Sequence, residues 1–127
     1  MSKKKKYIFL LSLITFSIYC AITIGQSWDE ADVLGRGKIT LDYLFSFGKI
    51  DKDIVYREIY STIYWSLNYL ITELFPLRYQ MEVSHLVNLT FSLGAIFGAA
   101  KLSKELFNKK LGKIVFIILF FYPIFFG

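Results

Sequence analysis

The sequence predicts an all-α integral membrane protein, with a helical bundle of about three spans and interfacial helices in its first outer loop. Hydrophobic residues make up 55% of the 127 residues, and the mean hydropathy is +0.48. A soluble domain of this size would have to expose large apolar patches to carry that composition. The apolar residues also form long blocks with lysines at their edges, which is the arrangement typical of membrane spans.

The first block, residues 7–25, follows four consecutive lysines, Lys3 to Lys6. A signal peptide has an apolar region of about 7–15 residues and a cleavage site with small residues. This block is longer, and Ile22-Thr23-Ile24-Gly25 offers no such site. We therefore predict an uncleaved span over residues 7–25 with a cytoplasmic N-terminus.

Residues 26–58 are rich in charge and glycine, which predicts an outer loop long enough to carry short helices. In residues 59–75, the aliphatic side chains fall on one face of a helix at about 100° per residue. Polar side chains, including Asn68 and Thr72, fall on the other face. This pattern predicts an interfacial helix whose aliphatic face meets lipid or the bundle, and we expect lysine to be tolerated at Ser61 and Thr72.

Residues 83–100 are predicted to be the second span, and five lysines follow them up to Lys113. If residues 59–75 lie on the surface, both lysine clusters are cytoplasmic, as the positive-inside tendency requires. Residues 114–127 begin a third span but are fewer than the roughly 20 that a crossing needs. We expect either a fragment of a longer chain or other subunits that supply the remaining spans. Gly94 and Gly98 predict close helix packing.

The net charge of +5 does not indicate a nucleic-acid partner, because the basic clusters flank apolar blocks and no nucleic-acid-binding motif accompanies them. The lone cysteine, Cys20, excludes an internal disulfide framework. The chain has no metal-ligand cluster and no nucleotide-binding fingerprint, so we expect no metal and no cofactor.

The stretch with the most chemical information is Ser27-Trp28-Asp29-Glu30, directly after the first span. Adjacent carboxylates at a membrane surface can act as a general base and orient a hydroxyl nucleophile. The alternative is structural, because acidic residues in the first turn of a helix interact favourably with its dipole.

The order of these segments resembles the GT-C superfamily of membrane glycosyltransferases. A single span with a cytoplasmic start is followed by Trp28-Asp29-Glu30 early in a long outer loop, and then by an amphipathic stretch. The nearest likeness is to the branch of protein O-mannosyltransferases and lipid A sugar transferases. The resemblance implies transfer of a sugar from a polyprenyl-phosphate donor to an acceptor hydroxyl at the outer membrane face. Asp29 would then be the catalytic base, and Glu30 would orient or support it.

Three further residues are candidates for donor binding. Arg36 and Arg57 could pair with a donor phosphate, or alternatively with neighbouring acids of the loop. His85 could be a ligand or proton shuttle, or simply a histidine that is hydrogen-bonded at the interface. The alternative function is a non-catalytic polytopic membrane protein, such as a transporter or an assembly subunit. For either function we expect a multi-pass protein of the cell membrane, with a bacterial inner membrane favoured over the endoplasmic reticulum.

Overall fold

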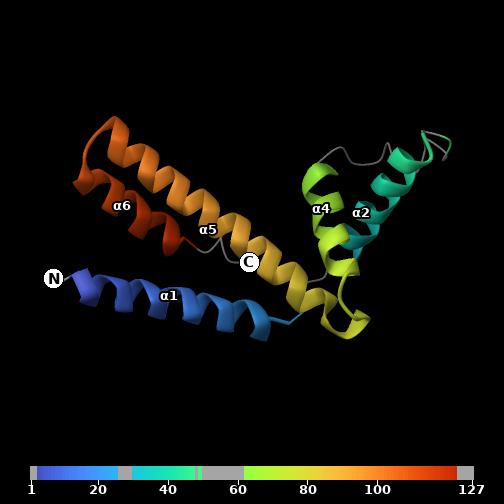
Figure 1. The fold of residues 1–127 in the computed structure, drawn as a ribbon, viewed down its shortest axis with the longest axis horizontal. Helices are drawn as coiled ribbons and strands as arrows, with labels where there is room; N and C mark the ends of the chain where they lie inside the picture. The colour runs from blue at the N-terminus through green and yellow to red at the C-terminus, as the bar shows by residue number, and fades with distance from the viewer. Residues whose placement is uncertain (1–2, 26–29, 48, 50–61, 123–127) are drawn as a thin grey trace. The chain divides into compact units, whose positions relative to one another are not determined.

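The computed structural model describes residues 3–25, 30–47, 49 and 62–122, and every regular element among them is a helix (Figure 1). This confirms the all-α prediction for the described residues. The chain divides into two compact units, one made of residues 1–24 and 85–127 and the other of residues 25–84.

Helix α1 (Lys3–Thr23) covers most of the predicted first span. Its polar side chains bond to the helix's own backbone: Ser17 Oγ donates to the Leu13 carbonyl at 3.0 Å, and Thr23 Oγ1 to the Tyr19 carbonyl at 2.8 Å. Such bonds satisfy hydroxyl groups where water is scarce. Large apolar side chains are nevertheless exposed along the helix, with Leu11 at 66% and Phe16 at 64%.

Helices α5 (Gln80–Leu106) and α6 (Lys109–Phe120) form an antiparallel hairpin (Figure 1). The turn is fixed by Asn108, whose side chain caps α6 by accepting a bond from the Leu111 amide at 2.9 Å. Further along, the Phe97 and Phe116 rings lie 5.3 Å apart. The predicted second span lies inside α5, and α6 contains residues 114–120 of the predicted third one.

Among the described residues, one continuous helical stretch, Leu77–Leu106, is long and apolar enough to cross a membrane. It includes the short 3₁₀ helix η1 (Leu77–Tyr79) before α5. The apolar part of α1, Tyr7–Thr23, is an apolar helix as well, but it is shorter than the length expected of a crossing helix.

The second unit is built on α2 (Glu30–Phe45) and α4 (Thr62–Glu73), which pack side by side (Figure 1). Helix α2 lies inside the predicted outer loop, which therefore carries a helix of 16 residues. Its close approach to α4 occurs at Gly37, where an added Cβ would meet the Trp65 carbonyl oxygen and lie 2.8 Å from Tyr69 Cβ.

The expected packing role of Gly94 and Gly98 is not seen among the described residues, because a Cβ at either position meets none of them within 4 Å. Gly112 of α6 has that role instead. A Cβ there would lie 2.8 Å from the Ala100 carbonyl oxygen and 2.8 Å from Lys104 Cβ. The small residue is thus needed on the shorter partner helix near the turn.

Helix α4 presents its polar side to the protein and its aliphatic side outward. Asn68 and Thr72 are 1% exposed, whereas Ile63 is 86% and Leu70 is 47% exposed. A helix on the surface of a soluble protein has the reverse polarity. The two faces predicted from the sequence are therefore present, but the expectation that Thr72 tolerates lysine is wrong, because its side chain is buried.

Candidate functional site

Glu30 is the first residue of α2, and Asp32 shares its first turn. Carboxylates are stabilised there by the positive end of the helix dipole. Asp29, the predicted base, lies outside the described residues, as does Arg57. The structure thus places one member of the predicted catalytic pair at the start of the helix that follows α1.

Arg36 is engaged by its own unit in two ways. Its Nε donates to Asp32 Oδ2 at 2.9 Å, one helical turn earlier, and its guanidinium lies over the Trp65 ring of α4 at 5.5 Å. An ion pair at this spacing supports the helix, and the stacking ties α2 to α4. The geometry favours the alternative given above, in which Arg36 pairs with a loop acid.

His85 belongs to the other unit, where its Nδ1 lies 2.9 Å from the Ala21 carbonyl oxygen. That carbonyl is one of the last four in α1, which have no partner inside the helix. With Nδ1 protonated, His85 donates to it and ties the end of α1 to α5. The contact favours the interfacial hydrogen-bonding role for His85.

The structure therefore divides the described candidates between the units: Glu30 and Arg36 lie in residues 25–84, and His85 lies in the other unit. Within the described part of the chain, no group of three or more histidine, cysteine or acidic side chains could hold a metal ion. Cys20 is a half-buried free thiol.

Sequence reasoning missed a buried polar contact between α4 and α5. The Asn68 amide donates to Ser84 Oγ at 2.8 Å, and both side chains are buried. The Asn68 Oδ1 atom is also buried and has no hydrogen-bond partner among the described residues. The helical pattern had separated Asn68 from the aliphatic residues, but a single sequence does not reveal which face contacts the protein.

Tyr69 extends the polar contacts between α2 and α4. Burial raises the pKa of its phenol, and a hydrogen bond with Glu73 and the negative charges of Glu73 and Asp42 raise it further. The phenol therefore stays protonated at neutral pH and can donate to the Glu73 carboxylate.

We expect Thr72→Lys to destabilise the unit formed by α2 and α4, and Ile63→Lys to leave its fold intact. A lysine at position 72 would bury a charge, which costs several kcal/mol in proteins, whereas position 63 is open. Thermal unfolding of the purified protein in detergent measures the difference. Equal loss of stability in both variants would contradict the observed orientation of α4.

In comparisons with known proteins, no protein-family model, no curated protein and no solved structure matches the chain.

Proposed function

We propose that this protein is a multi-pass membrane protein with its N-terminus and the α5–α6 turn in the cytoplasm. Its exposed apolar side chains support this, since Phe9 of α1 is 56% and Ile118 of α6 is 60% exposed. The orientation of α4 supports it as well, because a helix with its aliphatic side outward suits an apolar surrounding. Both spans begin or end in lysines, as the positive-inside tendency requires.

We further propose that the protein takes part in sugar transfer from a polyprenyl-phosphate donor at the outer membrane face, as its resemblance to GT-C glycosyltransferases implies. The observation that carries this proposal is the position of the Asp29-Glu30 pair. In the sequence, the pair follows α1 on the side away from its N-terminal lysines, and Glu30 is the first residue of α2. In the proposed topology this position is the outer membrane surface.

The proposed reaction is a direct displacement. Asp29 accepts the proton of the acceptor hydroxyl while the oxygen of that hydroxyl attacks the anomeric carbon of the donor sugar. The new carbon–oxygen bond forms while the bond to the lipid phosphate breaks, so the anomeric centre is inverted and the lipid phosphate leaves with its electron pair. Glu30 orients the acceptor. Arg57, in the same loop of the sequence, is the candidate for holding the phosphate, and Arg36 could do so only by giving up its bond to Asp32.

A second function is favoured by one specific observation. Glu30 and Asp32 occupy the first turn of α2, where acids stabilise a helix in any protein. In a non-catalytic membrane protein, such as a transporter or an assembly subunit, the Asp29-Glu30 pair would only start this helix.

Sugar transfer in reconstituted vesicles tests the proposal. Vesicles that contain the protein, a polyprenyl-phosphate sugar and a hydroxyl acceptor should release free polyprenyl phosphate and form an inverted glycoside. Product formation is followed with a radiolabelled donor, and protein-free vesicles are the control. No transfer from any of a panel of polyprenyl-phosphate sugars would favour the non-catalytic function.

The topology is tested separately in cells, so that a misplaced protein is not taken for an inactive one. Single cysteines at positions 29 and 110, on a Cys20→Ser background, are exposed to a membrane-impermeant thiol reagent. We expect labelling at position 29 from outside, and at position 110 only after the membrane is opened. The reverse pattern would contradict the arrangement.

A further inference from the structure

The two units carry opposite charge. Residues 1–24 and 85–127 hold nine lysines and a single acid, Glu105, whereas residues 25–84 hold nine acids and six basic residues. Glu105 is itself bonded to Lys104, with Nζ and Oε1 2.8 Å apart. The first unit thus has a large excess of positive charge.

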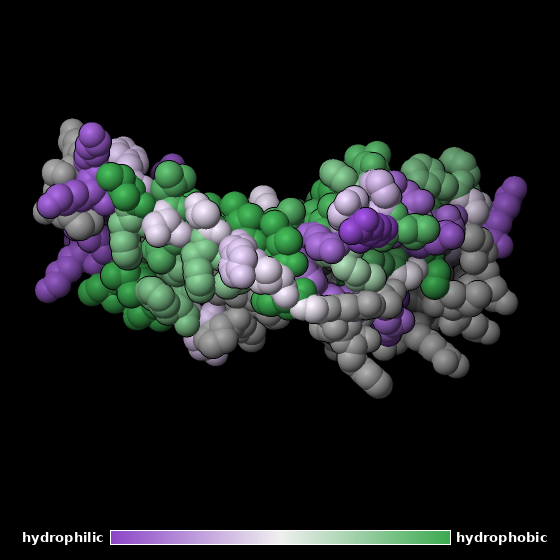
Figure 2. All heavy atoms as spheres, turned by 90° about the horizontal axis from the view of Figure 1, so that it is seen from below, coloured by the Kyte–Doolittle hydropathy of each residue, from purple (hydrophilic) through white to green (hydrophobic). Residues whose placement is uncertain are grey.

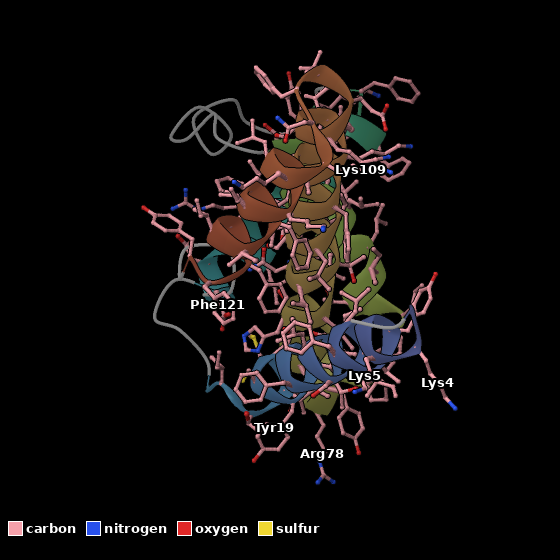
Figure 3. The ribbon with its side chains drawn as sticks, turned by 90° about the vertical axis from the view of Figure 1, so that its left-hand side faces the viewer. Lys4, Lys5, Tyr19, Arg78, Lys109 and Phe121 are labelled. Carbon is pink, nitrogen blue, oxygen red and sulfur yellow. The ribbon has the colours of Figure 1, made fainter. Side chains whose placement is uncertain are left out.

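All of these lysines lie at one end of their unit. The start of α1 and the turn between α5 and α6 are at the same end in Figure 1, and Figure 3 looks onto that end, with Lys4, Lys5 and Lys109 labelled. Figure 2 shows hydrophilic residues gathered there and hydrophobic ones covering the adjoining surface. We call this end the basic end; its described lysine side chains, all exposed, are Lys4, Lys5, Lys101, Lys104, Lys109, Lys110 and Lys113.

Lys109 and Lys110 do not stabilise α6, so helix stability does not explain why lysines occupy these positions. They occupy the first turn of α6, which holds no acid, and cations there are disfavoured by the helix dipole. An anion bound near this turn would offset the repulsion and could also accept from free backbone amides. The turn is therefore arranged to gain stability from an anionic partner.

Exposed apolar side chains between the lysines indicate which anion this is. Leu102 and Leu106 in the last part of α5, and Phe107 directly after it, are 60%, 66% and 69% exposed, and Tyr7 is 73% exposed beside the first lysines. Lysines interleaved with aliphatic and aromatic side chains fit a membrane surface, where the charges meet headgroups and the apolar groups enter the acyl boundary. A surface that binds single-stranded nucleic acid combines cations with stacking aromatic rings, whereas two of these four apolar side chains are leucines.

We propose that the basic end binds the phosphate-bearing headgroups of anionic phospholipids in the cytoplasmic leaflet. The proposal rests on the membrane part of the proposed function and not on sugar transfer. It assigns the lysines of the α5–α6 turn a binding role in addition to their effect on topology.

Selective retention of lipid tests this proposal. The protein is purified from detergent that contains equal amounts of phosphatidylglycerol and phosphatidylcholine, and bound lipids are counted by native mass spectrometry. We expect several-fold more phosphatidylglycerol than phosphatidylcholine on the wild type. K109Q/K110Q should lower this ratio at least twofold, and neutralising the other lysines of the basic end as well should bring it to about one.

The matched control is K38Q/K49Q, which removes two exposed lysines from the other unit. This variant should keep the wild-type ratio. Equal retention of the two lipids by the wild type, or the same loss in K38Q/K49Q, would overturn the proposal. Tight binding of single-stranded RNA that is weakened by K109Q/K110Q while the lipid ratio is unchanged would assign the surface to nucleic acid instead, and would also overturn it.

Two further measurements separate this proposal from the proposed function. Extraction of the protein from membranes by alkaline carbonate would contradict the membrane topology on which both depend. If the protein prefers phosphatidylglycerol but transfers no sugar, the result would support the lipid-binding surface and contradict only the proposed sugar transfer. Circular dichroism of K109Q/K110Q confirms that its helices are intact.

Discussion

Gly37→Ala should destabilise the packing of α2 against α4, whereas Gly35→Ala, two residues away in the same helix, should not. At position 37 an added methyl group meets the Trp65 carbonyl oxygen, which is backbone and cannot turn aside. At position 35 it meets nothing within 4 Å. Overpacking of this kind costs about 1–3 kcal/mol, while alanine in place of glycine inside a helix gains roughly 1 kcal/mol.

The stability of the two variants is therefore expected to change in opposite directions, which makes each a control for the other. Emission from Trp65, measured on a Trp28→Phe background, reports the α2–α4 contact directly, because the Arg36 guanidinium lies over that ring. Hydrogen exchange should show faster exchange in α2 and α4 of Gly37→Ala and unchanged exchange in α6. Stability gained equally in both variants would show that α2 does not approach α4 as described.

The long apolar helices follow directly from the sequence. Residues 7–25 and 83–100 are long apolar blocks next to lysines, a pattern that predicts helices, and α1 and α5 contain most of them. The exact end of α5 depends on the turn at Asn108, whose capping role is visible only once the Leu111 amide is placed next to it.

Helix α2 is harder to predict, because Gly35 and Gly37 have low helix propensity and are typical of loops. Its helix is accounted for by a tertiary contact, since Gly37 permits the close approach to Trp65 and Tyr69. The apolar and polar faces of α4 were predictable from periodicity, but their orientation was not. That orientation depends on partners such as Ser84, which lies 16 residues from Asn68 in the chain.

The candidate site likewise combines a local contact that the sequence predicts with a distant contact that it does not. The pairing of Arg36 with Asp32 is a local, one-turn interaction and was among the predicted alternatives. The partner of His85 lies 64 residues away, at the end of α1, and no local pattern identifies it. The role of Asp29 is a chemical hypothesis that neither periodicity nor packing can decide, so it requires an activity measurement.

Asp29→Asn should lower the rate of sugar transfer by a factor on the order of 10²–10⁴, the contribution typical of a general base. Asparagine keeps the size and shape of the side chain but cannot accept the proton of the acceptor hydroxyl. Glu30→Gln should cost less, because glutamine retains hydrogen bonds that can orient the acceptor. Donor binding should survive in both variants, since in the proposed mechanism the lipid phosphate is held by cations and not by these acids.

The control for this prediction is Asp32→Asn, which removes a neighbouring acid that is paired with Arg36 and has no role in the proposed proton transfer. It should change turnover far less than Asp29→Asn. The assay measures initial transfer rates in vesicles, with inserted protein quantified and donor affinity determined from the dependence on donor concentration. Because Asn is also a good residue at the start of a helix, Asp29→Asn preserves the structural role of this position. Unchanged turnover in this variant would therefore remove Asp29 from catalysis and leave the pair with its role at the start of α2.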